Sequence, residues 1–125
     1  MLILDTHVFL WWMAGGQRLL PDSRDAISRP DNACFVSAVV AWEIAIKVAL
    51  GKMPAPPESV AEGARLSGFR ELDISFRHAE EAGALPLHHA DPFDRMLVAQ
   101  ARTEDLTLVT ADRNLAAYDV PILWA

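Results

Sequence analysis

The chain alternates between short apolar runs and longer stretches in which apolar residues recur at helical spacing. Apolar runs that are too short for a helix, and that polar, Gly or Pro residues bound, predict buried strands. Four runs have this form, at residues 1–4, 33–37, 69–74 and 106–110, and a fifth at 121–124 is predicted to be an edge strand.

Helices are predicted between these strands. They cover residues 7–13, 21–28, 39–50, 76–85, 91–104 and 112–117, and a further helix begins near Pro57. Pro21 and Pro92 suit a first helical turn, and Gly51 suits a C-terminal cap. Alternating strands and helices predict an α/β fold with a mostly parallel sheet of four to five strands, flanked by helices on both faces.

The length and composition of the chain fit one folded domain. At 125 residues, with 52% hydrophobic and 22% charged residues, the chain is neither disordered nor long enough for several domains. The prolines at 54, 56 and 57 precede a predicted helix directly, so we read a loop there and not a domain boundary. We expect residues 1–125 to form a single domain.

The sequence favours a cytoplasmic protein. Its single cysteine, Cys34, has no partner for an internal disulfide, which fits a reducing compartment. A membrane-spanning helix needs about 20 mostly apolar residues, and no stretch of that length is present. The N-terminus lacks the basic residues of a signal peptide, and Asp5 interrupts its apolar segment.

Acidic residues stand where the predicted strands end. Asp5 follows the first strand and Asp112 comes just after the fourth, while Glu43 and Asp94 lie on the helices predicted at 39–50 and 91–104. Ligands of open α/β sheets bind outside the carboxyl ends of the strands. Four distant segments therefore deliver carboxylates toward one edge of the sheet.

Each acid also has a purely structural interpretation. Asp5 and Asp112 could cap helices, and Asp91 before Pro92 has the form of an N-cap, which we take as its main role. Glu43 and Lys47 have the spacing of a surface ion pair on a helix. That helix, however, is apolar nearly all round and is expected to be mostly buried, where a carboxylate is unfavourable unless it is paired or binds a metal.

A hard divalent cation would make such a group of carboxylates tolerable. Clustered acids raise one another's pKa values. Mg²⁺ takes oxygen ligands and commonly bridges to substrate phosphate, and it activates water for phosphodiester cleavage.

The sequence resembles the PIN-domain ribonucleases, and among them the VapC-type toxins of bacterial toxin–antitoxin pairs. The matching segments occur in the family's order and cover nearly the whole chain: LILDTHVFLWW, VSAVVAWEIAIKVALGK, HHADPFDRMLVAQA and LVTADRNLAAYDVPILWA. One departure is His7, where the family has a smaller residue.

The resemblance implies which residues form the site. It carries the family's acidic quartet onto Asp5, Glu43, Asp94 and Asp112 as catalytic and metal-binding residues, and it separates Asp94 from Asp91. Hydroxyl groups that orient these acids are implied at Thr6, Ser37 and Thr110. Arg95 fits the family pattern, and a salt bridge to a neighbouring acid is expected for it.

The resemblance also implies an activity and partners. The expected activity is endonucleolytic cleavage of RNA with Mg²⁺ or Mn²⁺, by in-line attack of a metal-activated water that leaves a 5′-phosphate and a 3′-hydroxyl. The expected partners are a second copy of the chain and a cognate antitoxin, through which alone operator DNA is bound. The apolar faces around Trp11, Trp12 and Trp42 are candidates for these contacts, although core packing also explains each tryptophan.

Three alternatives differ in chemistry. A phosphoryl-transfer enzyme or a receiver domain would need an acid at position 7, where His7 stands, or a lysine after a late strand, whereas the last lysine is Lys52. A zinc hydrolase using His88, His89 and Asp91 lacks helical ligand spacing. A non-catalytic PIN-like binding module would not need all four acids.

The net charge takes on a different meaning once a metal is considered. With 11 basic and 17 acidic residues, the formal charge of −6 argues at first against a nucleic-acid partner. Four acids assigned to a metal leave 13 against 11 basic residues, and Lys47, Lys52 and Arg95 could flank the groove. The charge of −6 then describes the metal-free protein.

Overall fold

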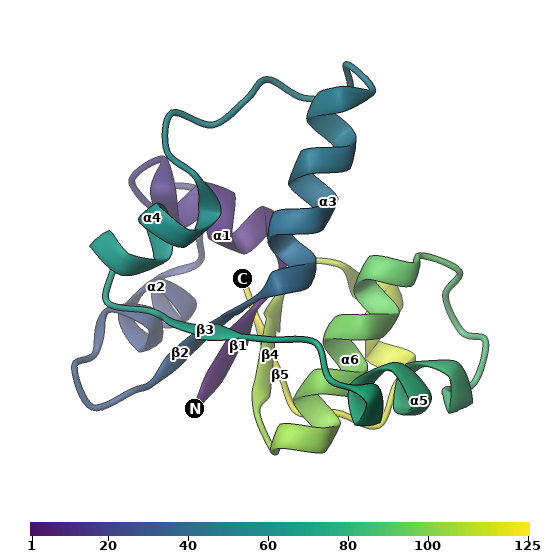
Figure 1. Ribbon diagram of the computed structural model, residues 1–125. Coiled ribbons are helices and arrows are strands. Elements are labelled where there is room, and N and C mark those ends of the chain that lie inside the picture. The colour runs from purple at the N-terminus through teal and green to yellow at the C-terminus, as the bar shows by residue number, and fades with distance from the viewer.

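Five parallel strands form one sheet at the centre of the molecule, in the order β3-β2-β1-β4-β5 (Figure 1). The computed structural model describes all 125 residues. The strands are β1 (Leu2–Leu4), β2 (Cys34–Ser37), β3 (Arg70–Leu72), β4 (Thr107–Thr110) and β5 (Ile122–Trp124). The predicted α/β fold with a parallel sheet is confirmed, and β5 is an edge strand as expected.

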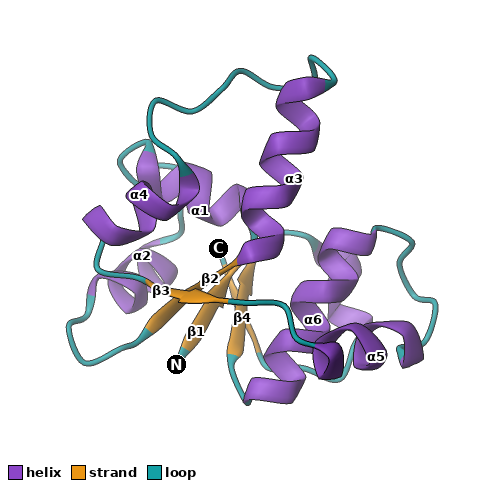
Figure 2. Ribbon diagram, viewed as in Figure 1, coloured by secondary structure: helices purple, strands orange, loops and turns teal.

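Helices connect the strands and cover both faces of the sheet (Figure 2). They are α1 (Thr6–Met13), α2 (Pro21–Ser28), α3 (Ala38–Ala49), α4 (Val60–Leu66), α5 (Phe76–Ala84) and α6 (Pro92–Glu104), with a 3₁₀ helix, η1 (Arg113–Ala117). None of them is long and apolar enough to cross a membrane.

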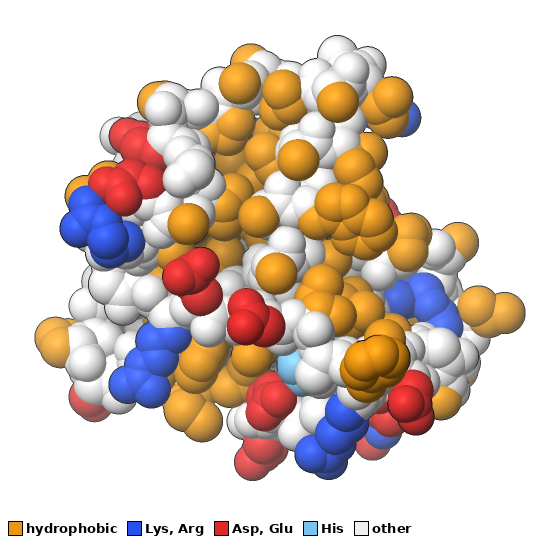
Figure 3. Space-filling model, in the orientation of Figure 1, with side chains coloured by type: hydrophobic (Ala, Val, Ile, Leu, Met, Phe, Trp, Pro, Cys, Tyr) orange, Lys and Arg blue, Asp and Glu red, His pale blue; other side chains and the backbone are white.

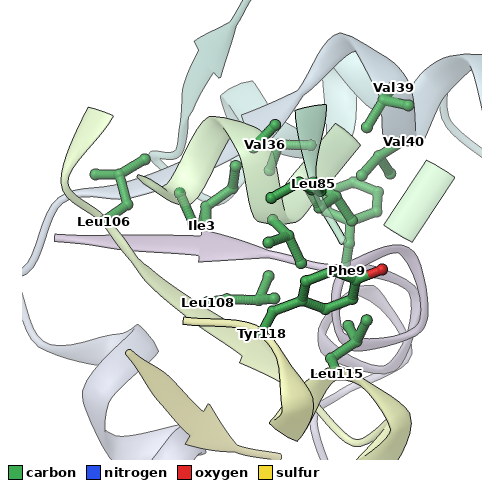
Figure 4. Close-up of a cluster of buried hydrophobic side chains, with 14 of the residues drawn as sticks. Ile3, Phe9, Val36, Val39, Val40, Leu85, Leu106, Leu108, Leu115 and Tyr118 are labelled. Carbon is green, nitrogen blue, oxygen red and sulfur yellow. The ribbon is translucent and has the colours of Figure 1, made fainter. Parts of the chain in front are cut away.

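Two hydrophobic cores lie on opposite faces of the sheet, because successive strand residues point to opposite sides. Ile3 and Leu108 belong to the larger core, which is shown in Figure 4 and packs against α3 and α6. Leu2 and Val109 belong to the smaller core, which packs against α2 through Ile27. The short strands are thus buried on both faces, which explains their uninterrupted apolar runs.

The expectation that α3 is mostly buried was wrong. Val40 and Ile44 are buried, but the indole of Trp42 is 58% exposed on another side of the helix. Ala41 and Ala45 are exposed as well and line a hollow beside α4, where Figure 3 shows hydrophobic side chains. The apolar residues of α3 could be covered on every side, but other elements of this chain cover only part of the helix.

The sheet topology places a crevice beside β1. From β1 the chain moves outward through β2 to β3, then crosses to β4 on the other side of β1 and continues outward to β5. Where connections leave adjacent strands in opposite directions, a crevice forms at the carboxyl ends of those strands. The pair of β1 and β4 is that point, and the first residue after β1 is Asp5.

Candidate active site

A polar pocket of about 200 Å³ opens at the carboxyl ends of β1 and β4. None of its nine lining residues is hydrophobic: Asp5, Thr6, His7, Glu43, Lys47, His89, Asp91, Asp94 and Asp112. We call this the acidic pocket. The structure brings together all four acids of the predicted quartet here, although they come from four separate segments of the chain.

Asp5 and Asp112 reach the pocket because each follows a strand and begins a helix. One oxygen of Asp5 accepts a hydrogen bond from the N–H of Val8, at 2.8 Å, and so caps α1. Its other oxygen accepts a hydrogen bond from the Thr110 hydroxyl. Asp112 caps η1 in the same way, through the N–H of Asn114 at 3.0 Å. Capping and a place in the pocket are therefore compatible for both acids.

Asp91 fixes the start of α6 and thereby the position of Asp94. As predicted, Asp91 is the N-cap, and its Oδ1 accepts hydrogen bonds from the N–H groups of Phe93 at 2.8 Å and Asp94 at 3.2 Å. Asp94 lies in the first turn of the helix, where its carboxylate faces the pocket. The helix N-terminus favours negative charge at both positions.

Glu43 is a buried carboxylate with two charge-stabilising partners. The hydroxyl of Thr6 donates to its Oε1, and the ammonium of Lys47 contacts its Oε2, each at 2.5 Å. The side chain of Glu43 is only 6% exposed, against 33% for Lys47. The ion pair suggested by the spacing is present, and the same carboxylate also lines the pocket.

Of the three hydroxyls expected to orient the acids, two do so. Thr6 bonds Glu43, and Thr110 both bonds Asp5 and accepts the N–H of Asp112 at 3.0 Å. Ser37 instead caps α3, where its hydroxyl accepts the N–H of Val39 at 3.0 Å, and it forms no hydrogen bond with any of the four acids. The Ser37 hydroxyl therefore stabilises the start of α3 and does not orient an acid of the pocket.

The histidine pair in the loop before α6 divides between two environments. His89 enters the pocket, with its Nε2 at 3.0 Å from Asp94 Oδ2 and 3.6 Å from Asp112 Oδ2. These three residues each offer one ligand atom, all within 4.8 Å of one another. His88 packs edge-on against Tyr118, with ring centroids 5.1 Å apart, and the zinc group of His88, His89 and Asp91 is not formed. The sequence singled out His89 only as a possible zinc ligand, and its place beside Asp94 and Asp112 was not predicted.

Arg95 forms no salt bridge, contrary to expectation, and it does not flank the pocket. Its guanidinium donates to the carbonyls of Ala82, Leu85 and Pro86 at 2.9–3.1 Å, and to the Tyr118 hydroxyl at 3.1 Å. The last turn of α5 and the loop after it turn carbonyl groups toward Arg95, so backbone oxygens take the place of a carboxylate. Lys52 is also absent from the lining of the pocket, whereas Lys47 is part of it.

Burial and crowding disfavour negative charge in the pocket. Burial raises the pKa of Asp5, although hydrogen bonds from Thr110 and Val8 oppose the shift. The pKa of Asp94 rises to about 7, first because it is buried and then because Asp91 repels its charge. The pKa of Lys47 is raised chiefly by its hydrogen bond with Glu43.

These observations fit a hard cation. The pocket is lined by carboxylates from five residues, the predicted quartet and Asp91, and carboxylate oxygens are the donors that Mg²⁺ and Mn²⁺ prefer. The ammonium of Lys47 already places one positive charge against Glu43. A divalent ion would relieve the repulsion that raises the pKa of Asp94.

Comparisons with known proteins identify the family of the chain. Residues 2–121 match the PIN domain family. The chain is 33% identical to Ribonuclease VapC22 of Mycobacterium tuberculosis over 127 aligned positions, which cover 95% of this chain and 92% of that protein.

Solved structures share the fold. A chain of VapBC2 from Rickettsia felis, bound to a DNA fragment from the promoter, superposes with a TM-score of 0.73 at 15% identity and covers 98% of this chain and 97% of its own length. A chain of DNA-bound VapBC from Salmonella typhimurium gives 0.70 at 18% identity, with 98% and 96% covered. The chain belongs to the PIN domain family and is related to the VapC ribonuclease toxins of VapBC toxin–antitoxin systems.

Proposed function

We propose that this protein is a metal-dependent endoribonuclease and the toxin of a type II toxin–antitoxin pair, formed by residues 1–125 as a single PIN domain. The observation that carries the proposal is the acidic pocket, in which four carboxylates meet at the crevice between β1 and β4. Kinship with a VapC ribonuclease supports the same activity.

The proposal divides the residues at the pocket into metal ligands and groups that hold those ligands in place. Asp5, Glu43, Asp94 and Asp112 hold Mg²⁺ or Mn²⁺, while Thr6 and Thr110 fix the oxygens of Glu43 and Asp5 through their hydroxyl groups. When bound, the metal supplies Lewis acidity and positive charge at the scissile phosphodiester. Asp5, Asp91 and Asp112 each cap a helix, and these hydrogen bonds hold the carboxylates in position before RNA binds.

The decisive experiment compares RNA cleavage by matched variants. The wild-type protein should cleave total RNA with Mg²⁺ or Mn²⁺ and not with EDTA, leaving 5′-phosphate ends. Asp94→Asn should reduce the rate at least about 100-fold, since it removes a proposed metal ligand. Asp119→Asn, at an exposed position outside the pocket, should cleave as the wild type does. Absence of cleavage by freshly purified wild-type protein with both metals would reject the proposal.

An antitoxin has an apolar surface available to it. A cleft of about 450 Å³ lies between α1, α4 and residues 53–59, lined by Phe9, Leu10, Met13 and Met53 among others. We propose that an apolar segment of the antitoxin fills it. Met13→Glu should prevent capture of the antitoxin encoded beside this chain, while Arg77→Glu, on the exposed part of α5, should not.

The toxin role and the assembly are tested in cells and in solution. Expression of the chain alone should stop growth, and co-expression of the antitoxin should restore it; normal growth would contradict the toxin role. The family resemblance also suggests a cytoplasmic homodimer that reaches operator DNA only through the antitoxin. Trp42, which packs edge-on against Phe93 with ring centroids 5.3 Å apart, is a candidate for the dimer contact.

A further inference from the structure

A row of planar side chains leads away from the acidic pocket along α1. His7 lines the pocket, and its ring centroid lies 6.1 Å from that of Trp11, one helical turn further along. The guanidinium carbon of Arg18 lies over the Trp11 ring, 4.7 Å from its centroid. We call His7, Trp11 and Arg18 the α1 row.

Two glycines after α1 reverse the direction of the chain, which brings Arg18 back to Trp11. Gly15 and Gly16 have φ angles of 106° and 76°, which side chains other than glycine rarely adopt. The N–H of Gly16 donates to the carbonyl of Trp11 at 2.8 Å, so the chain reverses as soon as α1 ends. Arg18 is thereby held against the face of Trp11.

A second stack of the same kind adjoins the pocket. Arg113 directly follows Asp112, and its guanidinium carbon lies 4.0 Å from the centroid of Trp124. Trp124 is paired in register with Thr110, whose hydroxyl contacts Asp5. Both stacks therefore adjoin residues that line the acidic pocket.

The two arginines keep their charge available. Arg18 and Arg113 are exposed, and no carboxylate oxygen lies within 4.0 Å of either guanidinium, unlike those of Arg29, Arg65 and Arg102. An exposed arginine held on a tryptophan offers a flat surface and a positive charge at one place.

Single-stranded nucleic acid matches these surfaces. Unpaired bases stack on aromatic rings and guanidinium planes, and the adjacent phosphates pair with arginine. The bases of a duplex are already stacked and cannot do so. The alternation of planar and cationic groups therefore fits an unpaired polynucleotide better than an acidic protein segment.

We propose that the α1 row and the Arg113–Trp124 stack bind unpaired nucleotides of the substrate next to the acidic pocket. The proposal rests on the proposed function, because it takes the acidic pocket as the place of cleavage. It assigns Arg18, Trp11, His7 and Arg113 to the binding of RNA and not to the chemical step.

The test measures binding of a short unstructured, fluorescently labelled RNA in EDTA, where no cleavage occurs. Arg18→Lys keeps the charge and removes the plane, so it should weaken binding about tenfold, and Arg113→Lys should do the same. Arg77→Lys is the matched control, since Arg77 is also exposed and unpaired, and it should stay within about twofold of the wild type. Melting temperatures check that each variant remains folded, and His7→Ala provides a second substitution in the row.

Several results would overturn the proposal. Stacking of unpaired bases would be contradicted if both lysine variants bound the RNA as tightly as the wild type does. It would also be contradicted if Arg77→Lys lost as much affinity as they do, or if a duplex of the same sequence bound equally tightly. Displacement of the RNA by polyglutamate as readily as by unlabelled RNA would show that only charge is recognised.

Failure of this proposal is distinguishable from failure of the proposed function. If the wild type cleaves the RNA with Mg²⁺ while Arg18→Lys and Arg113→Lys bind normally, the nuclease assignment stands and the stacking surface is wrong. If RNA binding weakens in both variants but the wild type cleaves no RNA, the surface stands and the nuclease assignment is wrong.

Discussion

Lys47 is the only lysine or arginine that lines the acidic pocket, and its ammonium contacts Glu43. A metal ion that binds Glu43 must compete with this contact or share the carboxylate with it. Lys47 therefore stabilises the metal-free fold and at the same time opposes metal binding.

Replacing Lys47 should separate these two effects. Lys47→Met leaves the buried charge of Glu43 without its partner and should lower the free energy of unfolding in EDTA by about 1 kcal/mol, a modest value because Lys47 is partly exposed. Mg²⁺ should bind the variant more tightly than the wild type in a calorimetric titration. Lys52→Met, just beyond the end of α3, should change neither quantity; weaker Mg²⁺ binding by Lys47→Met would contradict the competition.

The raised pKa of Asp94 predicts how stability depends on pH. An unfolded aspartate has a pKa near 3.9, while that of folded Asp94 is about 7. Between these values the folded state holds a proton that the unfolded state has lost. The contribution of Asp94 is thus fully present below about pH 4 and is lost as the pH rises through 7.

Melting of the metal-free protein between pH 5 and pH 8 measures this contribution. The melting temperature of Asp94→Asn should fall less with rising pH than that of the wild type, and the difference between the two proteins isolates the one carboxylate. An identical pH dependence in both would contradict the raised pKa of Asp94.

At the residue scale, the sequence predicted where the four acids lie better than it predicted which groups Ser37 and Arg95 contact. Asp5 and Asp112 could be predicted because each follows an apolar strand. Ser37 and Arg95 were misjudged because a hydroxyl or a guanidinium bonds whatever the local backbone presents. That backbone is a helix end for Ser37 and a turned loop for Arg95.

At the scale of elements, Arg95 joins α6 to the loop that carries His89. It donates to carbonyls of residues 82–86, and both it and the N–H of His89 contact the Tyr118 hydroxyl. The position of His89 in the pocket depends on this arrangement.

Removal of the guanidinium should release the loop. Arg95→Met leaves several carbonyl groups without a donor and should lower the free energy of unfolding by about 3 kcal/mol. Hydrogen exchange at the His89 amide should accelerate. Arg102→Met, on the same helix but in a more exposed ion pair with Glu81, should cost less than about 1 kcal/mol. Equal stability of the two variants with a protected His89 amide would contradict the role of Arg95.

Element positions were predictable from periodicity, but their surroundings were not. The predicted helix at 91–104 matches Pro92–Glu104 closely, because Asp91 and Pro92 mark its start. The strand predicted at 69–74 shortens to Arg70–Leu72, an edge strand that contains two exposed charged residues and is followed by Asp73. The exposed side of α3 could not be predicted, because apolar spacing does not show which neighbour covers it.

At the scale of the whole molecule, a large part of the excess of acidic over basic residues lies in the acidic pocket. Four of the 17 acids of the chain form the proposed quartet. Metal binding should therefore act on global stability as well as on activity, because an ion that binds only the folded state shifts the unfolding equilibrium.

Mg²⁺ should raise the melting temperature, and EDTA should reverse the rise. At about 100 times its dissociation constant, a ligand adds about 2.7 kcal/mol to the free energy of unfolding. Asp5→Asn keeps a capping side chain for α1 but loses a charge, so the effect of Mg²⁺ should shrink strongly. Asp119→Asn should respond as the wild type does, and a full response in Asp5→Asn would contradict its role as a ligand.

The hydrogen bond between Thr110 and Asp5 joins residues 105 positions apart. Asp5 directly follows β1 and Asp112 comes just after β4, so the pocket closes only when β4 docks beside β1. During translation the growing chain therefore has an incomplete acidic pocket until β4 has been made. Under the proposed function, the growing chain would therefore cleave no RNA, that of its own ribosome included, until β4 has been synthesised and has docked beside β1.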